Sequence, residues 1–193
     1  MIRRLPLVPT LLVLVAVAVM IRLGFWQLDR LHQKEALLAR YAAAAGMSAE
    51  VPFPQTPQAA EAVLYRHSRV DCVKVASVTT VAGQNARGES GLVEAADCAL
   101  ADGGKARVVL GWLQSPQPVA WSGGQVAGIV APGPRLVADP PQAGLSANAV
   151  PDPASIPNNH LSYAVQWFLF AAVALVIYAL AVRKRLADPG PRG

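Results

Sequence analysis

Two long apolar segments, one near each end of the chain, dominate the hydrophobic pattern. The first is LPLVPTLLVLVAVAVMI, which ends at Ile21, and the second runs from Leu161 to Val182 without a formal charge. A helix needs about 20 mostly apolar residues to cross a bilayer. The pattern therefore predicts two transmembrane helices, over residues 1–23 and 158–183.

Between these segments, the pattern predicts a helical extension followed by β-strands. Good helix formers continue beyond the first span as LDRLHQKEALLARYAAAA, so we expect the helix to extend through residues 24–45 and to stop at Gly46. β-Branched residues with partial alternation then occur between turn-like segments, which predicts about four antiparallel strands within residues 63–130. The alternation breaks between Cys72 and Val73, which indicates a β-bulge.

Residues 131–157 are rich in proline, and we expect them to form an irregular return to the membrane. Proline at this spacing removes backbone donors and excludes a regular helix or a central strand. The predicted fold is a membrane α+β protein, in which two transmembrane helices flank a small, mainly antiparallel outer domain. This domain would cover residues 24–157, and residues 184–193 would form a tail.

The positive charges predict how the chain is oriented in the membrane. Arg183–Arg185 follow the second span directly, whereas the uncharged Asn158 and Asn159 precede it. Because Lys and Arg next to a span favour the cytoplasmic side, we expect both termini in the cytoplasm and the central domain outside. A cleaved signal peptide is the alternative for the first segment. Its small-residue candidate site at 42–45, however, lies about twenty residues past the apolar end, across charged positions.

Charge and motifs exclude several classes of function. The net charge of +5 comes largely from residues that flank the spans, and no basic stripe interleaved with aromatic residues occurs, so nucleic acid is not an expected partner. The sequence contains no G-x-S-x-G, no Walker loop, no H-E-x-x-H and no His/Cys cluster at metal spacing. A membrane-anchored enzyme would need a cluster of titratable groups, which the middle of the chain does not supply, so we expect no catalytic activity.

Cys72 and Cys98 are the only cysteines, and their midpoint falls in the turn-like AGQNARG. In a hairpin centred on this turn they would face each other. On the oxidising side of the membrane such a pair predicts a disulfide. A copper-carrying thiol pair is the alternative, but it would need a short Cys spacing or nearby Met and His ligands, which are missing.

Two short motifs far apart in the sequence are expected at the same membrane face. The motif GFWQLDR covers residues 24–30 at the end of the first span, and PNNHLSYAVQWF covers residues 157–168 at the start of the second. Two antiparallel spans joined by an outer domain bring these ends together. One face of the second helix would carry four residues at helical spacing, His160, Tyr163, Ala164 and Trp167, and could form a shelf with a small residue among aromatic ones.

With these motifs the chain resembles the surfeit locus protein one (Shy) family of mitochondrial and bacterial cytochrome c oxidase assembly factors. Weaker matches occur in VVLGWLQSP, residues 108–116, and in GGQVAG, residues 123–128. The resemblance implies a barrel-like outer domain. The segment before the final helix is shorter here than is usual in the family, which implies a smaller domain.

The resemblance also implies a function, which is to hold haem a for insertion into the haem-bearing subunit of cytochrome c oxidase. His160 matches the motif histidine of the family, a proposed ligand of the haem iron. A helix N-terminus capped by Asn158 or Asn159 would keep His160 neutral, as iron requires. Arg30 and Lys34 would pair with the haem propionates. The full set of expected cofactor-binding residues is His160, Trp167, Tyr163, Arg30, Lys34, Trp26 and Gln27.

The location implied by the resemblance is the inner membrane of a bacterium, with the central domain in the periplasm. Besides the lipid bilayer, the expected partners are the haem-bearing oxidase subunit and the haem a synthase. The main alternative is a protein-only scaffold that stabilises an oxidase assembly intermediate without binding haem. In that case His160 would only help to anchor the helix start, and the aromatic residues would belong to the membrane-interface belt. Arg30 and Lys34 would then snorkel or pair with nearby acids, whereas His32 and His67 match no family position and are taken as surface residues.

Overall fold

The computed structural model describes residues 6–187, so Arg3, Arg4 and the last six residues of the expected tail lie outside the described residues. The chain forms two compact units. One contains the two ends of the chain, and the other is Leu38–Ile156. The first is helical and the second is built mainly from strands, and each is described by itself.

The helical unit consists of most of α1, Leu7–Ala45, together with α3, His160–Ala187. Helix α1 continues without a break to Ala45, as the run of helix formers predicts. Both helices are long and apolar enough to cross a membrane, and only 11% and 6% of their most apolar windows are buried. A core helix of a soluble protein would be mostly covered, so the exposed apolar surface fits contact with lipid.

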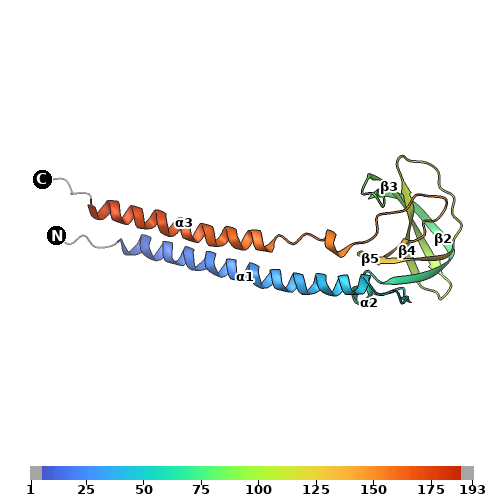
Figure 1. Ribbon diagram of the computed structural model, residues 1–193, viewed down its shortest axis with the longest axis horizontal. Coiled ribbons are helices and arrows are strands. Elements are labelled where there is room, and N and C mark those ends of the chain that lie inside the picture. The colour runs from blue at the N-terminus through green and yellow to red at the C-terminus, as the bar shows by residue number, and fades with distance from the viewer. Residues whose placement is uncertain (1–5, 188–193) are drawn as a thin grey trace. The chain divides into compact units, whose positions relative to one another are not determined.

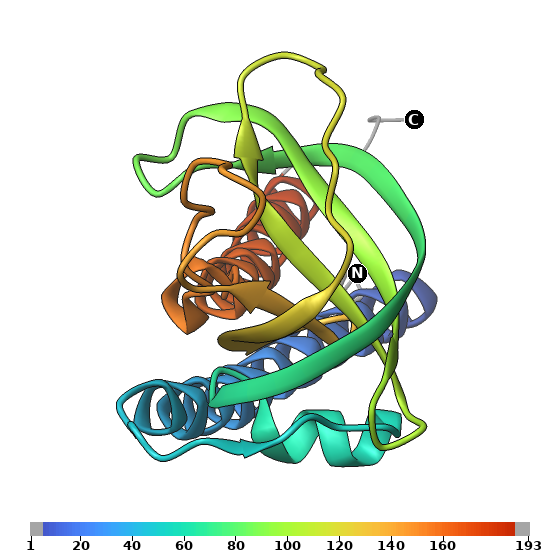
Figure 2. The same ribbon diagram turned by 90° about the vertical axis from the view of Figure 1, so that its right-hand side faces the viewer.

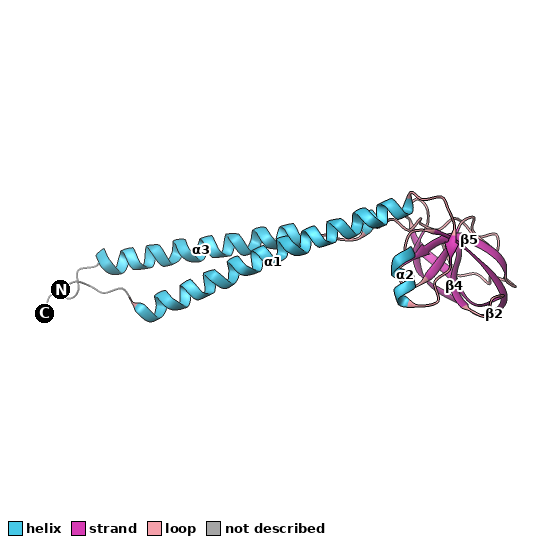
Figure 3. Cartoon of the chain, turned by 90° about the horizontal axis from the view of Figure 1, so that it is seen from below, coloured by secondary structure: helices cyan, strands magenta, loops and turns pink. Residues whose placement is uncertain are grey.

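Helices α1 and α3 lie side by side and antiparallel (Figures 1 and 3). Side-chain hydrogen bonds join Thr10 to Tyr178 near one end of the pair and Gln27 to His160 near the other. Between them, covered positions recur every three or four residues: Val13, Val17, Met20 and Gly24 on α1, and Ala164, Trp167, Ala171 and Ala174 on α3. Small residues and polar pairs are what membrane helices use to associate closely. The antiparallel pairing places the two outer ends of the helices on the same side.

The second unit contains six strands and two short helices. Their bounds are β1 Val51–Pro52, α2 Pro57–Val63, β2 His67–Gln84, β3 Ser90–Leu100, β4 Lys105–Leu113, β5 Gly124–Ala131, β6 Arg135–Ala138 and the 3-10 turn η1 Pro153–Ser155. Four of these strands match the four that the sequence predicts. The expected bulge is also present, as a register shift between Cys72 and Lys74 in the pairing of β2 with β3.

Five of the strands pair in a closed circuit. The long β2 pairs with β5 through its first residues and with β3 through its later ones, and it curves around the other strands (Figure 2). The circuit runs β2–β3–β4–β6–β5 and back to β2, with β4 and β6 parallel and the other neighbours antiparallel. The last strand thus lies between the third and fourth, which is the Greek-key arrangement of five-stranded OB-fold barrels. The expected mainly antiparallel, barrel-like sheet is therefore present.

The core of this unit lies inside the circuit of strands. Its largest fully buried aliphatic side chains are Val108, Leu110, Val126, Val130 and Leu136. The disulfide between Cys72 and Cys98 belongs to the same cluster, with a Cα–Cα distance of 5.4 Å. The bulges shift the register, so Cys72 lies opposite Leu100 and Cys98 opposite Val75. The cysteines are therefore diagonal neighbours, although the predicted disulfide is formed.

One feature of the fold contradicts the expectation for the proline-rich segment 131–157, and a second feature, helix α2, was not predicted. Strand β6 lies inside residues 131–157 and is central, because it pairs with both β4 and β5. It fits there because its four residues fall between Pro134 and Pro140, so no proline interrupts its ladder. Helix α2 also begins in a proline-rich stretch, with Pro57 in its first turn and the Thr56 side chain accepting a hydrogen bond from the N–H of Ala59.

Candidate functional site

His160 is the first residue of α3, and its ring contacts α1. Its Nδ1 lies 2.7 Å from Oε1 of Gln27. An amide oxygen only accepts hydrogen bonds, so this contact pairs it with an Nδ1 that donates. In the neutral tautomer with this proton, Nε2 would be the nitrogen available to a metal. Gln27 was expected at the site from the motif, but its contact with His160 follows only from the helix packing.

The start of α3 is formed by the backbone of Asn159, whose carbonyl oxygen accepts a hydrogen bond from the N–H of Tyr163 at 3.2 Å. A side-chain cap from Asn158 or Asn159 was expected, but neither side chain forms one within the described residues. The Oδ1 of Asn158 is instead buried without a hydrogen-bond partner. Buried polar atoms usually have a partner, so this oxygen marks the helix start as a place where a further donor could bind.

The expected site residues on α1 make different contacts. The Arg30 guanidinium lies over the ring of Trp26 at 5.5 Å and donates a hydrogen bond from Nη1 to Oε1 of Gln33 at 2.9 Å. Arg30 and Trp26 are exposed, whereas Gln27 is partly covered against α3. Lys34 follows Gln27 by seven residues, which is two helical turns and therefore the same side of α1. Gln27 alone of these residues hydrogen-bonds to His160.

The residues of α3 do not form the expected shelf. Ala164 is only 1% exposed and belongs to the contact between the helices, so it is not an open floor among aromatic rings. Trp167 is partly covered and packs edge to face on Phe170, with 6.2 Å between the ring centroids. Tyr163 is 51% exposed and points away from the contact. The residues of the expected shared face therefore differ in burial, with Ala164 buried and Tyr163 exposed.

Sequence reasoning missed the contact that sets the spacing of the helices beside His160. A Cβ on Gly24 would lie 2.6 Å from Cε1 of Phe168, so only glycine permits this approach. Phe25 also packs edge to face on Phe168, at 5.4 Å between ring centroids. Both Gly24 and Phe168 stand inside the two motifs, and the small-residue preference of paired membrane helices was the signal that could have revealed them.

The described residues around His160 offer one histidine and no cluster of metal ligands. Within residues 6–187, no group of three or more His, Cys, Asp or Glu side chains could hold a metal ion. A haem iron needs only axial ligands from the protein, and neutral histidine is a common one. A neutral His160 that donates from Nδ1 to Gln27 could supply such a ligand through Nε2. The unpartnered Oδ1 of Asn158 is two residues away in the sequence.

The comparison with known families agrees with the motif residues. The model of the SURF1 family matches residues 14–172, which include most of α1, the whole strand unit and the first part of α3. No curated protein sequence and no solved structure is significantly similar to the chain. The match covers far more than half of the chain and contains both motifs. The chain therefore belongs to the SURF1 family, a family of membrane-associated oxidase assembly factors and not an enzyme class.

Proposed function

We propose that this protein assists cytochrome c oxidase assembly by holding haem a with His160 and presenting it to the haem-bearing subunit of the oxidase. The observation that carries the proposal is the 2.7 Å contact between Nδ1 of His160 and Oε1 of Gln27. A second group that orients a ligating histidine raises the basicity of the ring and selects the nitrogen that binds the metal.

The surroundings of His160 support binding of an amphipathic, anionic cofactor. The first turn of α3 presents free backbone N–H groups, which favour negative charge. On α1, Arg30 and Lys34 supply two cations within two turns of Gln27. Arg30 now contacts Trp26 and Gln33, so we propose that it exchanges the Gln33 hydrogen bond for a haem propionate. Trp167 and the exposed Trp26 and Tyr163 would each contact an apolar part of the porphyrin, without forming one continuous shelf.

The proposed location follows from the helices and the charges. Arg183–Arg185 at the end of α3 favour the cytoplasm, so His160 and the strand unit would lie on the periplasmic side of a bacterial inner membrane. There the Cys72–Cys98 disulfide would be stable. Haem a would come from the haem a synthase and pass to the oxidase subunit, both of which are membrane partners in this proposal.

A scaffold without haem is the second candidate, and one observation favours it. Arg30 already has a ring and an amide as partners, so this cation does not require a propionate. In this function the helices and the strand unit would hold an oxidase intermediate, and the Gln27–His160 pair would act as a polar contact between membrane helices.

The two functions differ in the optical spectrum of the protein. Purification in detergent from cells that make haem a should yield a Soret band, and the His160→Ala variant should lose or shift it. The control is Asn159→Ala, which keeps the ring and should keep the band. If His160→Ala accumulates normally and shows an unchanged haem spectrum per molecule, the ligand assignment is wrong. A wild-type protein without any Soret band would favour the scaffold.

A further inference from the structure

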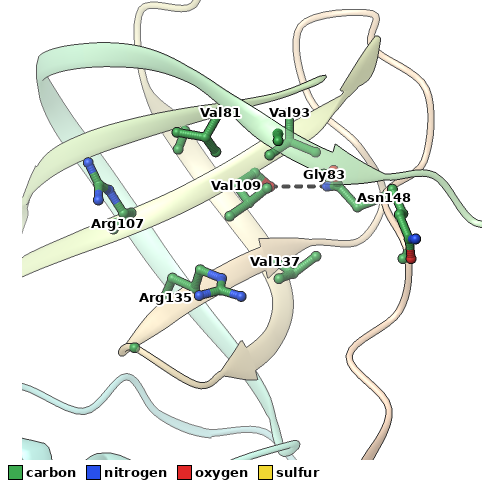
Figure 4. Close-up of a pocket in the computed structure, with 13 residues that line it drawn as sticks. Val81, Gly83, Val93, Arg107, Val109, Arg135, Val137 and Asn148 are labelled. Carbon is green, nitrogen blue, oxygen red and sulfur yellow. Dashed lines mark hydrogen bonds between the residues drawn. The ribbon is translucent and has the colours of Figure 1, made fainter. Parts of the chain in front are cut away.

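A groove of about 480 Å³ crosses the outer face of the strand unit. None of the residues that line it belongs to the proposed haem site or to the motifs at 24–30 and 157–168. Its apolar part is formed by Val81, Val93, Val109 and Val137 from four different strands, and Arg107 and Arg135 lie on one side (Figure 4). Gly83 lets the backbone of β2 lie close to the Val93 side chain in this groove, because a Cβ at that position would lie 2.5 Å from Cγ1 of Val93.

The two arginines leave one positive charge without a partner. Arg107 and Arg135 lie opposite each other on the parallel strands β4 and β6. Arg107 binds Asp97 through two hydrogen bonds, at 3.1 and 3.3 Å. Arg135 donates from Nη1 to the carbonyl oxygen of Pro132 at 2.6 Å, and it pairs with no carboxylate within residues 6–187. Like charges in opposite positions of neighbouring strands repel each other, so this pair would be stabilised by an anion.

Asn148 lines the groove and is also incompletely paired. It is 7% exposed, its Nδ2 lies 3.4 Å from the carbonyl oxygen of Val109, and its Oδ1 has no hydrogen-bond partner. A buried amide oxygen without a donor is rare in a native fold. Asn148 therefore indicates that a ligand of this groove supplies polar groups as well as a negative charge and an apolar body.

A free strand edge borders the same groove. Residues 74–81 of β2 pair with β3 along one edge, and within the described part of the chain no other strand pairs with the second edge. The side chains of Val78 and Val81 in this stretch are exposed. Exposed edges with β-branched residues and few charges bind further strands, and proteins usually block them when no partner exists.

We infer that this groove binds an extended polypeptide segment of a partner protein, with a carboxylate next to a short apolar stretch. The main chain of the segment would extend β2 along its free edge, and its apolar side chains would cover the valines. Its carboxylate would bind Arg135 beside Arg107. Strand addition provides affinity through backbone hydrogen bonds, whereas the side-chain sites provide specificity. The inference does not depend on haem binding, because the groove consists only of residues from the strand unit.

The test uses the full-length protein in detergent and two fluorescein-labelled decapeptides of alternating Thr and Val with amidated ends. One peptide carries Asp at its last position and the other Asn, and fluorescence anisotropy measures their affinities. We expect the Asp peptide to bind about tenfold more tightly, as one charge-assisted contact with arginine would give. Arg135→Gln should remove this difference, and Val81→Lys should weaken both peptides. The control Arg87→Gln changes an exposed arginine outside the groove and should leave both affinities unchanged.

Several results would overturn the inference. They are absence of binding by both peptides, equal affinity of the two peptides, or an Asp preference that survives Arg135→Gln. Displacement of the Asp peptide by decanoate at the same concentration as by unlabelled peptide would show a general site for small apolar anions. Light scattering that finds a dimer disrupted by Val81→Lys would assign the groove to a second copy of this chain. Circular dichroism and the intact disulfide verify that each variant is folded.

Discussion

Nδ1 of His160 lies 2.7 Å from Oε1 of Gln27, although 133 positions separate the two residues in the sequence. The contact joins the starting residue of one apolar helix to the middle of another. It favours the neutral tautomer that carries its proton on Nδ1, in which Nε2 is available to a ligand. The proposed role of His160 as a haem ligand therefore depends on Gln27, which a test of His160 alone would not reveal.

Replacing Gln27 by Leu should weaken haem binding without removing the iron ligand. The loss of a group that orients a ligating histidine reduces metal affinity by about 10- to 100-fold. Haem a titration in detergent, followed by the Soret band, should show this reduction with a band at an unchanged wavelength. The control is Gln117→Leu, which changes an exposed glutamine of the strand unit, away from His160 and Arg30 in the sequence. Equal affinities of Gln27→Leu and the unmodified protein would contradict the orienting role.

Gly24→Ala should disturb the packing of α1 on α3. The new Cβ would lie 2.6 Å from Cε1 of Phe168, and overpacking of this kind costs about 1–3 kcal/mol. Thermal unfolding in detergent should show the loss of stability. The double variant Gly24→Ala with Phe168→Leu should recover part of it, since the smaller side chain makes room. A Gly24→Ala protein as stable as the unmodified one would show that the helices do not approach this closely.

Replacing both cysteines by Ser should destabilise the strand unit while leaving the haem spectrum per molecule unchanged. The disulfide joins residues 26 positions apart, and closing a loop of this length is worth about 3 kcal/mol in the chain-entropy description. Denaturant unfolding followed by circular dichroism measures the loss. Mass mapping of the unmodified protein should find Cys72 linked to Cys98. Two free thiols in protein from an oxidising compartment would refute the pairing.

Reporter fusions should locate the start of α1 and the end of α3 on the cytoplasmic side of the membrane. A reporter fused after Arg185 should be active only in the cytoplasm, and one inserted in the exposed loop 114–123 only outside. The physical reason is the basic cluster 183–185, which is retained on the cytoplasmic side. Because α1 and α3 are antiparallel, a fusion before Leu7 should behave like the one after Arg185. Activity of the loop insertion in the cytoplasm would exclude a periplasmic haem site.

The turn between β2 and β3 should lose stabilisation in acid. Hydrogen bonds from the Arg87 guanidinium and the Asn85 amide hold the pKa of Glu89 below its usual value. A carboxylate with a lowered pKa stabilises the fold above its unfolded pKa of about 4.3, and this contribution disappears as the pH falls through the folded pKa. NMR titration of the Glu89 carboxyl should therefore show a midpoint below about 4.3. In the Arg87→Gln variant the midpoint should move back up, and an ordinary midpoint in the unmodified protein would contradict the contact.

Local patterns in the sequence were enough to predict the helices and most strands. The length of the two apolar segments predicts the two membrane-spanning helices, because the thickness of the bilayer requires about the same number of apolar residues in every such helix. Alternation and turn residues predict β2 to β5 because side chains of a strand alternate between two faces. The disulfide follows from the same pattern, since the hairpin turn brings Cys72 and Cys98 together even though the bulges displace them by a few positions.

The tertiary structure decided everything that depends on contacts between distant residues. Strand β6 is flanked by prolines and pairs with both β4 and β5. These neighbouring strands stabilise it, and no local sequence pattern reveals them. The tertiary structure also buries Ala164 and exposes Tyr163, which the helical spacing put on one face. Helical spacing predicts which residues of one helix are neighbours. Which face of that helix is buried depends on how the partner helix packs against it. The pairing of His160 with Gln27 arises from that packing, because two side chains meet only when the packing of both helices sets their rotation and depth.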